Sequence, residues 1–265
     1  MVTSILGCGW FGLDFGERLV KAGHEVKGST TSAEKLPMLI SKGIDPFVIN
    51  LPNDSPLIDP VFFRCDALVL TIPPKLTKRP VDEYLSVVNK VIEHVRTYHI
   101  EHVVFISSTS VYDDVNDRVD ENTLPSPTTA SGKAVLQAET LFRSEDTFTT
   151  TIVRFAGLIG PGRDPANFFA GKKNIPNGQA PVNLIHLEDC SGFCLAILEK
   201  NAFGHTLNAC SPRHPRRMDF YVQSAIRAGV AIPDFMDELK QWKIVGTNFA
   251  SLLDYRYRSE LLDLI

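Results

Sequence analysis

The sequence contains no apolar run that approaches the roughly 18 residues of a membrane-spanning helix. Neither Lys nor Arg precedes Arg18, so the short apolar run at the start lacks the basic flank of a signal peptide. Positive charge is not in excess either, because 27 Lys and Arg against 31 Asp and Glu give a net charge of −4. These absences argue against a membrane protein and a nucleic-acid-binding protein, and they favour a cytoplasmic location.

A disulfide framework is also missing, because the five cysteines are odd in number and scattered along 265 residues. Reduced thiols are the simple interpretation and fit the cytoplasm. Cys190 and Cys194 stand four apart on a predicted helix, which is a possible metal-binding spacing, but no third ligand follows at zinc-like spacing. We therefore predict buried thiols and no metal. An apolar content of 44% is ordinary for a soluble globular protein.

A glycine-rich turn follows the first apolar run. Residues 2–6 lead directly into Gly7-Cys8-Gly9-Trp10-Phe11-Gly12, then apolar residues recur at helical spacing up to Gly23, and a second strand is predicted at residues 25–28. Strand, G-x-G-x-x-G, helix and strand in this order are typical of a dinucleotide-binding unit. We expect Gly7 to form the turn, Gly9 to admit a pyrophosphate, and Gly12 to pack helix on strand, with the helix N-terminus at Trp10 and Phe11 on the phosphate. The alternative is a glycine-rich turn without a ligand.

The end of the second strand indicates which dinucleotide is bound. An acidic residue there binds the ribose 2′-hydroxyl of NAD and repels the 2′-phosphate of NADP. Here the strand leads instead into hydroxyl side chains with two lysines nearby: Thr30, Thr31, Ser32, Lys27 and Lys35. We therefore predict NADP in preference to NAD. Thr31 and Glu34 also have the spacing of a capping box for the next helix, which is compatible with cofactor binding.

Strands and helices alternate along the first two-thirds of the chain. Further strands are predicted at residues 45–51, 67–72, 103–106 and 151–155, and helices at residues 81–98 and 134–142, with a Pro- and Asp-rich surface loop at residues 52–64. Later, strands are predicted at residues 182–185 and 206–209 and helices at residues 187–199 and 216–227. This order predicts an α/β fold, a doubly wound Rossmann parallel sheet with a small C-terminal region covering the substrate.

We divide the chain into an NAD(P)-binding unit, residues 1–156, and a substrate-binding C-terminal region, residues 157–265, interleaved with the sheet as one compact unit. Ligands of such sheets bind at the carboxyl ends of the strands. Ile72 and Pro73, at the end of the strand predicted at residues 67–72, are therefore expected to border the cofactor.

Three later segments resemble one known family. Residues 105–113, which include Ser107, Ser108, Val111 and Tyr112, resemble the S-S-x-x-V-Y-G segment of extended short-chain dehydrogenases/reductases, the NAD(P)-dependent epimerase/dehydratase family. Residues 154–162 resemble that family's L-R-x-x-x-x-Y-G-P-G stretch, and residues 183–189 resemble its I-H-V-x-D element. The segments occur in the family's order and cover nearly the whole chain, so the chain is similar to atypical members of the superfamily.

The resemblance implies a changed catalytic site. In the family's Y-x-x-x-K motif, Tyr is the general acid/base, and Lys lowers the pKa of Tyr and binds the nicotinamide ribose. Here Thr129 takes the Tyr position and Lys133 keeps the Lys position, with a solvent-exposed helix lysine as the alternative for Lys133. An aliphatic hydroxyl is a poor proton donor or acceptor near neutral pH. The resemblance makes Ser108 the residue that binds the substrate oxygen, with a turn-capping serine as the alternative, and places Ser107 at the cofactor. Tyr112 is a candidate replacement for the missing Tyr, with the structural role that the resemblance implies for this position as the alternative.

Residues after the strand predicted at 151–155 are expected to line the substrate site. Arg163 has the charge to bind an anionic substrate, or else it pairs with Asp164, and Asn167 follows in the same loop. His186 is a candidate base, with a structural histidine at a strand end as the alternative. Asp189 is expected to cap the helix predicted at residues 187–199.

Two functions remain open. The first is an NAD(P)-dependent oxidoreductase, or an epimerase/dehydratase with transient hydride transfer, that acts on a small carbonyl, hydroxyl or sugar-like molecule. The second is a non-catalytic NAD(P)-binding sensor or interaction protein, which the lost Tyr favours. The short C-terminal region indicates a substrate simpler than a nucleotide sugar. Family members often dimerise through the helices that correspond to residues 81–98 and 134–142, which predicts a homodimer.

Overall fold

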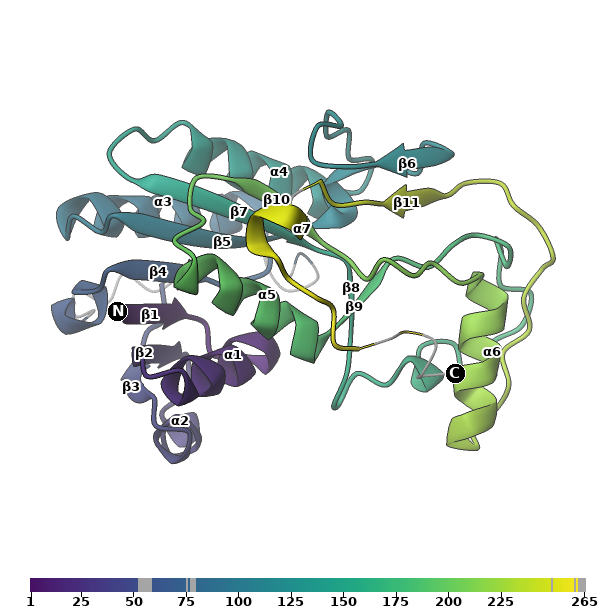
Figure 1. Ribbon diagram of the computed structural model, residues 1–265, viewed down its shortest axis with the longest axis horizontal. Helices are drawn as coiled ribbons and strands as arrows, with labels where there is room; N and C mark the ends of the chain where they lie inside the picture. Colours follow the sequence, from purple (N-terminus) through teal and green to yellow (C-terminus); the bar gives the residue numbers. More distant parts are fainter. Residues whose placement is uncertain (52–58, 75, 77–79, 249, 260, 262–265) are drawn as a thin grey trace.

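A computed structural model describes residues 1–51, 59–74, 76, 80–248, 250–259 and 261. Its centre is a seven-stranded sheet in the order β10-β7-β5-β4-β1-β2-β3, in which each neighbouring pair is parallel (Figure 1). The strands are β1 (Val2–Leu6), β2 (Glu25–Thr30), β3 (Asp45–Val48), β4 (Ala67–Leu70), β5 (His102–Ser108), β7 (Thr149–Phe155) and β10 (Thr206–Ala209). The predicted doubly wound fold is confirmed, with its switch point between β1 and β4.

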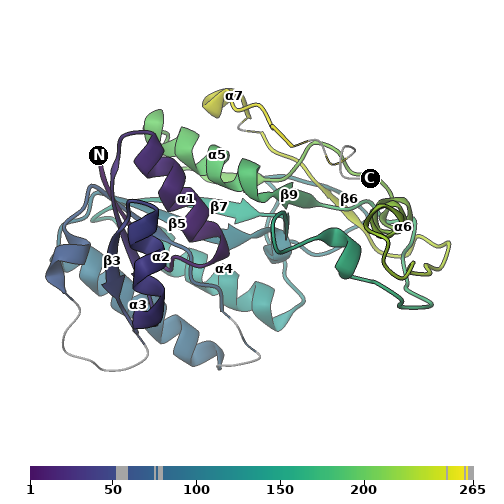
Figure 2. The ribbon, with the colours of Figure 1, turned by 90° about the horizontal axis from the view of Figure 1, so that it is seen from below.

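Helices cover both faces of the sheet. Helices α1 (Trp10–Lys21) and α5 (Leu187–Glu199) pack together on one face, and α3 (Val81–Thr97) and α4 (Ala130–Arg143) pack together on the other (Figure 2). The short α2 (Leu36–Ser41) connects β2 to β3. Each long helix buries one apolar stripe, as in α3, where Tyr84, Val88, Val91 and Val95 are at most 1% exposed. The two helical layers thus enclose a separate apolar core on each side of the sheet.

Smaller elements lie beyond the carboxyl ends of the central strands. β8 (Gly157–Ile159) pairs with β9 (Leu184–His186), and β6 (Asp117–Val119) pairs with β11 (Lys243–Val245); α6 (Arg217–Ala228) lies at this end of the molecule, and α7 (Ala250–Leu253) follows β11 along the chain (Figure 1). Short 3-10 helices occur at Ala33–Lys35, Pro60–Phe63, Thr109–Val111 and Pro165–Asn167. Because α5 and β10 return to the central layers, the two halves of the chain are interleaved, and the boundary at residue 156 stays a prediction.

Element ends differ from the sequence prediction where partners lie far along the chain. The helix at Leu187–Glu199 and the strand at Thr206–Ala209 match the prediction, whereas α4 begins four residues earlier than the helix predicted at 134–142. The strands β6, β8 and β11 were missed because each has three residues and exists only through its partner. In the loop predicted at residues 52–64, residues 52–58 lie outside the described residues. Phe62 and Phe63 are fully buried, so that part of the prediction is wrong.

Among the described helices, none combines the length and the apolar character needed to cross a bilayer. The apolar side chains of α3 and α4 that suggested a homodimer pack largely in the core of this chain, including Tyr84, Val91, Ala138 and Phe142. The homodimer therefore stays a prediction, with less apolar surface to support it than the sequence indicates.

Candidate functional site

The glycine-rich turn joins β1 to α1 with three different steric requirements. Gly7 has φ +109°, and a Cβ there would lie 2.7 Å from Thr71 Oγ1. A Cβ on Gly12 would lie 2.6 Å from the Gly7 carbonyl oxygen, so close packing of α1 on β1 excludes any side chain. A Cβ on Gly9 would meet nothing within 4 Å. The space above Gly9 is therefore open at the N-terminus of α1, where unpaired amides favour an anion.

Neighbouring strands hold this turn in place. The Gly7 amide donates to Ser29 Oγ at 2.9 Å, and the Cys8 amide donates to the Ser29 carbonyl at 2.7 Å. The Thr71 hydroxyl donates to the carbonyl oxygens of Leu6 or Gly7. Thr71, just after β4, borders the site but was missed, since a threonine after a strand carries no motif.

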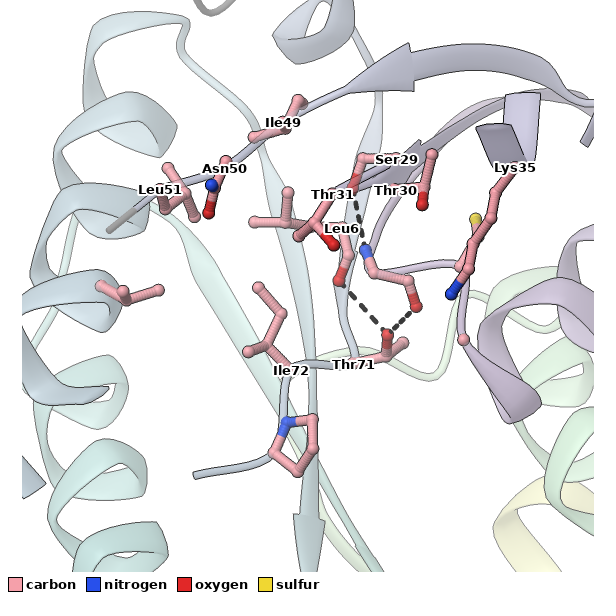
Figure 3. Close-up of a pocket in the computed structure, with 15 residues that line it drawn as sticks. Leu6, Ser29, Thr30, Thr31, Lys35, Ile49, Asn50, Leu51, Thr71 and Ile72 are labelled. Carbon is pink, nitrogen blue, oxygen red and sulfur yellow. Dashed lines mark hydrogen bonds between the residues drawn. The ribbon is translucent and has the colours of Figure 1, made fainter. Parts of the chain in front are cut away.

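A first cavity of about 200 Å³ opens between the ends of β1, β2, β3 and β4. Figure 3 shows Lys35 on one side, Asn50 and Leu51 on the other, Thr31 between them and Ile72 below. Of the residues described around this cavity, Lys35 is the only charged one, and no Asp or Glu is among them. Thr30 and Pro73 also border the cavity, as predicted, whereas Ser32 is not part of its lining. The segment at residues 49–51 was not anticipated as part of the site.

Two sequence interpretations near this cavity are wrong. Lys27 is 6% exposed and its Nζ donates to the carbonyls of Val61 at 2.9 Å and Arg64 at 2.6 Å, so its charge is used inside the protein. The Thr31–Glu34 capping box is not formed, because Ser32 is the N-cap of the short 3-10 helix and makes no side-chain capping bond. Alternation along β2 places Lys27 on the face away from α1, beneath the Pro60–Phe63 turn.

A second cavity of about 350 Å³ continues from the first along the carboxyl edge of the sheet. The two share Gly7, Gly9, Thr71, Ile72 and Pro73, so they form one cleft across the switch point. The second cavity is also bordered by Trp10, Phe11, Gly12, Pro74, Tyr84, Ile106, Ser107, Ser108, Val135, Phe155, Ala156, Leu158 and Arg163. A cleft that spans the glycine-rich turn, with open space above Gly9, fits an extended dinucleotide.

The two serines of β5 differ in how their hydroxyls are used. Ser107 is 6% exposed and its hydroxyl donates to Glu139 Oε1 at 2.5 Å. Ser108 accepts a bond from the Ser110 amide at 3.1 Å, so it caps the short turn after β5, which is the structural alternative considered above. A hydroxyl that accepts one bond can still donate its own hydrogen. Ser108 can therefore both cap the turn and donate to an oxygen in the second cavity.

Tyr112 is not part of the lining of either cavity, and its placement matches the structural alternative. Its hydroxyl donates to the Asp120 carbonyl at 2.8 Å and accepts from Arg154 Nη1 at 2.6 Å, and the residue is 3% exposed. Burial raises the pKa of Tyr112, with Arg154 opposing that shift. Tyr84, 1% exposed, is the phenol that does border the second cavity among the residues described there.

Lys133 lies outside the cleft, contrary to the role implied by the resemblance. It is exposed and borders a separate surface hollow, whereas Val135 of the same helix borders the second cavity. The two residues point about 200° apart around α4. Counting the family's spacing from the residue that faces the cleft puts Val135 at the Lys position and exposed Ser131 at the Tyr position. Thr129 instead caps α4, since its Oγ1 accepts from the Gly132 amide at 3.0 Å.

A buried ion pair stands behind the second cavity. Arg154 is 1% exposed and donates from Nε and Nη2 to the two carboxylate oxygens of Glu139, at 2.9 and 2.6 Å. The Glu139 side chain is fully buried. The bidentate geometry satisfies both charges and connects α4 to β7. Ser107, on β5, therefore faces a carboxylate that is already neutralised.

The predicted substrate residues separate in space. Arg163 borders the second cavity, and Asp164, its suggested partner, accepts instead from the Ala166 amide at 2.9 Å. Asn167 is exposed and is not part of the cavity lining. His186 is the N-cap of α5, because its Nδ1 accepts from the Glu188 amide at 3.2 Å, and it too lies outside the lining. The placement of His186 matches the structural alternative.

Asp189 does not cap α5, so that prediction is wrong. It is 1% exposed, and its carboxylate accepts from the Tyr255 hydroxyl at 2.9 Å and from the amides of Arg258 at 2.7 Å and Ser259 at 3.1 Å. A carboxylate with three donors stabilises a folded segment efficiently. Asp189 thus holds the C-terminal segment against α5.

The five cysteines are free thiols, and all but Cys65 are buried. Burial raises the pKa of the Cys8 thiol to about 12, and it raises the pKa values of Cys190 and Cys194 strongly. Such thiols stay protonated and are poor metal ligands and nucleophiles. Within the described ranges, no cluster of three or more His, Cys, Asp or Glu side chains is arranged to hold a metal.

Comparisons with known proteins agree with this geometry. A family model described as NAD(P)H-binding matches residues 7–201. The chain is 34% identical over 263 residues to Protein YeeZ of Escherichia coli (strain K12), covering 97% of this chain and 95% of that protein.

Solved structures agree on the fold. A putative NAD-dependent epimerase/dehydratase from Methylobacillus flagellatus has a TM-score of 0.77 at 24% identity, covering 97% of this chain and 92% of that one. A UDP-glucuronic acid 4-epimerase from Bacillus cereus, in complex with NAD, has a TM-score of 0.80 at 19% identity, covering 99% and 95%. At these identities the structures show a shared fold alone.

Proposed function

The chain belongs to the NAD(P)H-binding family, with an epimerase/dehydratase-like fold, and from this premise we propose that it binds NADP(H) and exchanges a hydride with a small carbonyl or hydroxyl compound. The observation that carries the proposal is the continuous cleft across the switch point, in which Gly9 leaves space at the N-terminus of α1. This is where an α/β sheet of this topology binds a dinucleotide.

The adenosine half is assigned to the first cavity, between the segment at residues 49–51 and Ile72, with the pyrophosphate at the N-terminus of α1. The nicotinamide half is assigned to the second cavity, where apolar walls from Val135, Phe155 and Leu158 exclude water. When bound, the nicotinamide supplies or accepts the hydride. Ser108 orients the substrate by donating its hydroxyl hydrogen to the substrate oxygen.

NADP is proposed over NAD because of the charges around the first cavity. Lys35 is exposed, and within the described part of the chain it forms no ion pair, so its ammonium is available to a 2′-phosphate. Thr31 supplies a further hydroxyl to the lining of the same cavity. The residues described around this cavity include no carboxylate that would repel a phosphate. Lys27 is not part of this argument, because its Nζ is bonded elsewhere.

A second candidate, a dinucleotide-binding sensor without turnover, is favoured by the placement of α4. Val135 stands where the family's Lys would face the cofactor, and Tyr112 lies in the core. Proton transfer would then depend on Ser108, on Tyr84 or on water, each a weaker acid than the Lys-assisted phenol of the family.

Location and partners are proposals of the same kind. A small-molecule substrate, no nucleic acid and no membrane are the partners that the charge and the cleft suggest. The five free thiols favour the reducing cytoplasm. Sedimentation at micromolar concentration would decide the homodimer.

Titration with NADPH and NADH tests the proposal, followed by a screen of carbonyl, hydroxyl and sugar-like compounds. We expect NADPH to bind more tightly than NADH, and Lys35→Gln to remove most of that difference, about tenfold for a charge-assisted contact. Absence of binding by both nucleotides would overturn both candidates. Tight binding without turnover across the screen would leave the sensor.

Once a substrate is found, Ser108→Ala should lower kcat without weakening NADPH binding, because Ser108 is assigned to the substrate oxygen. The matched control is Lys133→Ala, which removes a charged side chain from the outer face of α4 and should change neither quantity. Equal rates for Ser108→Ala and the unaltered protein would contradict the assigned role.

A further inference from the structure

Arg163 makes an unusual contact at the N-terminus of α1. Its guanidinium carbon lies 4.4 Å from the centre of the Trp10 ring, a cation–π geometry. Trp10 is the first residue of α1 and directly follows Gly9, above which the space is open. The contact joins two segments that are more than 150 residues apart in the sequence. It brings the loop after β8 to the place where the cofactor's phosphates are assigned.

The loop that carries Arg163 is shaped to keep it there. Gly160 and Arg163 exchange backbone hydrogen bonds of 3.2 and 2.8 Å, closing a tight turn. Gly160 and Gly162 have φ +138° and +75°, a region that favours glycine. The Trp10 indole Nε1 donates to the Pro161 carbonyl at 2.6 Å, which anchors the turn on α1. The guanidinium is therefore held by the turn and by the ring beneath it.

Among the residues that the structure describes, no carboxylate pairs with the charge of Arg163. Asp164 beside it is bonded to the Ala166 amide. It is the sole charged side chain among the residues described around the second cavity. The first turn of α1 holds no acidic residue either. An arginine preorganised by stacking, with free donors facing a cleft, is suited to an anion.

The pyrophosphate of a dinucleotide needs such a cation. The N-terminus of α1 offers about half an elementary charge, too little to balance two phosphates. Lys27 donates into the core and Lys133 lies on the outer face of α4, so neither reaches the site. Lys35 borders the first cavity, on the adenosine side. Of the described residues, Arg163 is the cation that remains at the middle of the cleft.

We propose that Arg163 binds the pyrophosphate of the bound dinucleotide, across from Gly9, and that Trp10 is the positioning residue that presents its guanidinium. This inference rests on the proposed dinucleotide binding and replaces the substrate-binding role expected from the sequence.

Three ligands distinguish the role of Arg163 from the proposed dinucleotide binding itself. NADPH and ADP-ribose contain the pyrophosphate, whereas adenosine 2′-monophosphate occupies the adenosine half without any 5′-phosphate. Arg163→Gln should weaken NADPH and ADP-ribose about tenfold to hundredfold, the loss expected for charge-assisted hydrogen bonds, and leave the monophosphate unchanged. Arg163→Lys, which keeps charge but not planar stacking, should fall between. Arg96→Gln, at the exposed end of α3, is the control.

Unchanged affinity of Arg163→Gln for both pyrophosphate ligands would overturn the proposal while leaving dinucleotide binding intact. Equal weakening of all three ligands would also overturn it, because the effect would not be specific to the pyrophosphate. If none of the three binds the unaltered protein, the proposed function itself fails.

Tryptophan emission supplies an independent readout of the Trp10 contact. The chain has two tryptophans, so Trp242→Phe leaves Trp10 as the only tryptophan. ADP-ribose should change the Trp10 emission in this background, since a phosphate bound to the guanidinium alters the charge that lies over the ring. The change should disappear when Arg163→Gln is added. Persistence of the full change without Arg163 would contradict the proposed contact.

Discussion

Replacing Gly9 and Gly12 one at a time with alanine separates ligand binding from folding at the glycine-rich turn. Gly9 has an extended backbone with φ −84°, so alanine would not be forced into a positive φ there, and its Cβ would meet nothing within 4 Å. Alanine is less favoured than glycine at an N-cap, which lowers the free energy of unfolding, but alanine also restricts the unfolded chain, which raises it. Because the two effects oppose each other, the free energy of unfolding should change by less than about 1 kcal/mol. The new methyl group would, however, occupy the space assigned to the pyrophosphate.

The expected loss in Gly9→Ala therefore falls on the cofactor. Moving the phosphate out of reach of one backbone amide costs about 1.5–3 kcal/mol, or roughly tenfold to hundredfold in NADPH affinity. Titration of NADPH fluorescence measures the affinity, and urea unfolding measures the stability.

Gly12→Ala should have the opposite signature. Its Cβ would lie 2.6 Å from the Gly7 carbonyl oxygen and 3.2 Å from Ile5 Cγ2, so the backbone of α1 must shift. Overpacking of this kind costs about 1–3 kcal/mol, and the better helix propensity of alanine returns up to about 1 kcal/mol. We expect a net loss of about 1–2 kcal/mol in the free energy of unfolding. The reasoning would be refuted if Gly9→Ala bound NADPH normally, or if Gly12→Ala were as stable as the unaltered chain.

Other predictions follow from buried charges and thiols. Glu139→Gln should destabilise the fold by about 3–5 kcal/mol in urea unfolding, because Arg154 is left buried without a counter-ion; Arg96→Gln, which breaks an exposed pair, should cost less than about 1 kcal/mol. The pKa of Cys8 is about 12 in the folded chain against an ordinary value of 9.0, so the unfolded chain loses this proton first as pH rises. Stability should therefore fall by up to about 1.4 kcal/mol per pH unit from this thiol between pH 9 and pH 12, and Cys8→Ala should flatten the slope. Lys133→Ala should leave the NADPH affinity unchanged, because Lys133 lies outside the cleft. A tenfold loss of affinity would contradict that position.

The glycine-rich turn and the strand order around it were predictable because local rules govern them. Gly7 has φ +109°, and a Cβ on Gly12 would clash with a carbonyl oxygen, so the local backbone requires glycine at both positions. The two glycines therefore identify the turn from the sequence. Ile72 and Pro73 were predictable too, since they follow a continuous apolar strand, β4, at its carboxyl end. The segment at residues 49–51 was missed as part of the site, because its position depends on pairing between β2 and β3.

The catalytic interpretation depended on helix phase, which the sequence pattern did not define. Placing the helix at residues 134–142 leaves the direction of Lys133 open, whereas a start at Ala130 turns Val135 to the cleft and Lys133 to the outside. The Tyr112 hydroxyl lies in the core, where it accepts a hydrogen bond from Arg154 of β7. Both outcomes arise from contacts between elements that are distant along the chain.

The amino-acid order was sufficient to establish a doubly wound sheet, a dinucleotide turn and the lack of an acid after β2, because turn sterics, apolar periodicity and charge at a strand end are local properties. Tertiary packing alone decided which charges reach the cleft. Lys27 was withdrawn to backbone carbonyls, Lys133 was turned outward, and Arg163 was carried to Trp10 by a loop from the other half of the chain. The partner of a long charged side chain lies on whichever surface the fold places beside it, and that surface is formed by residues distant along the sequence.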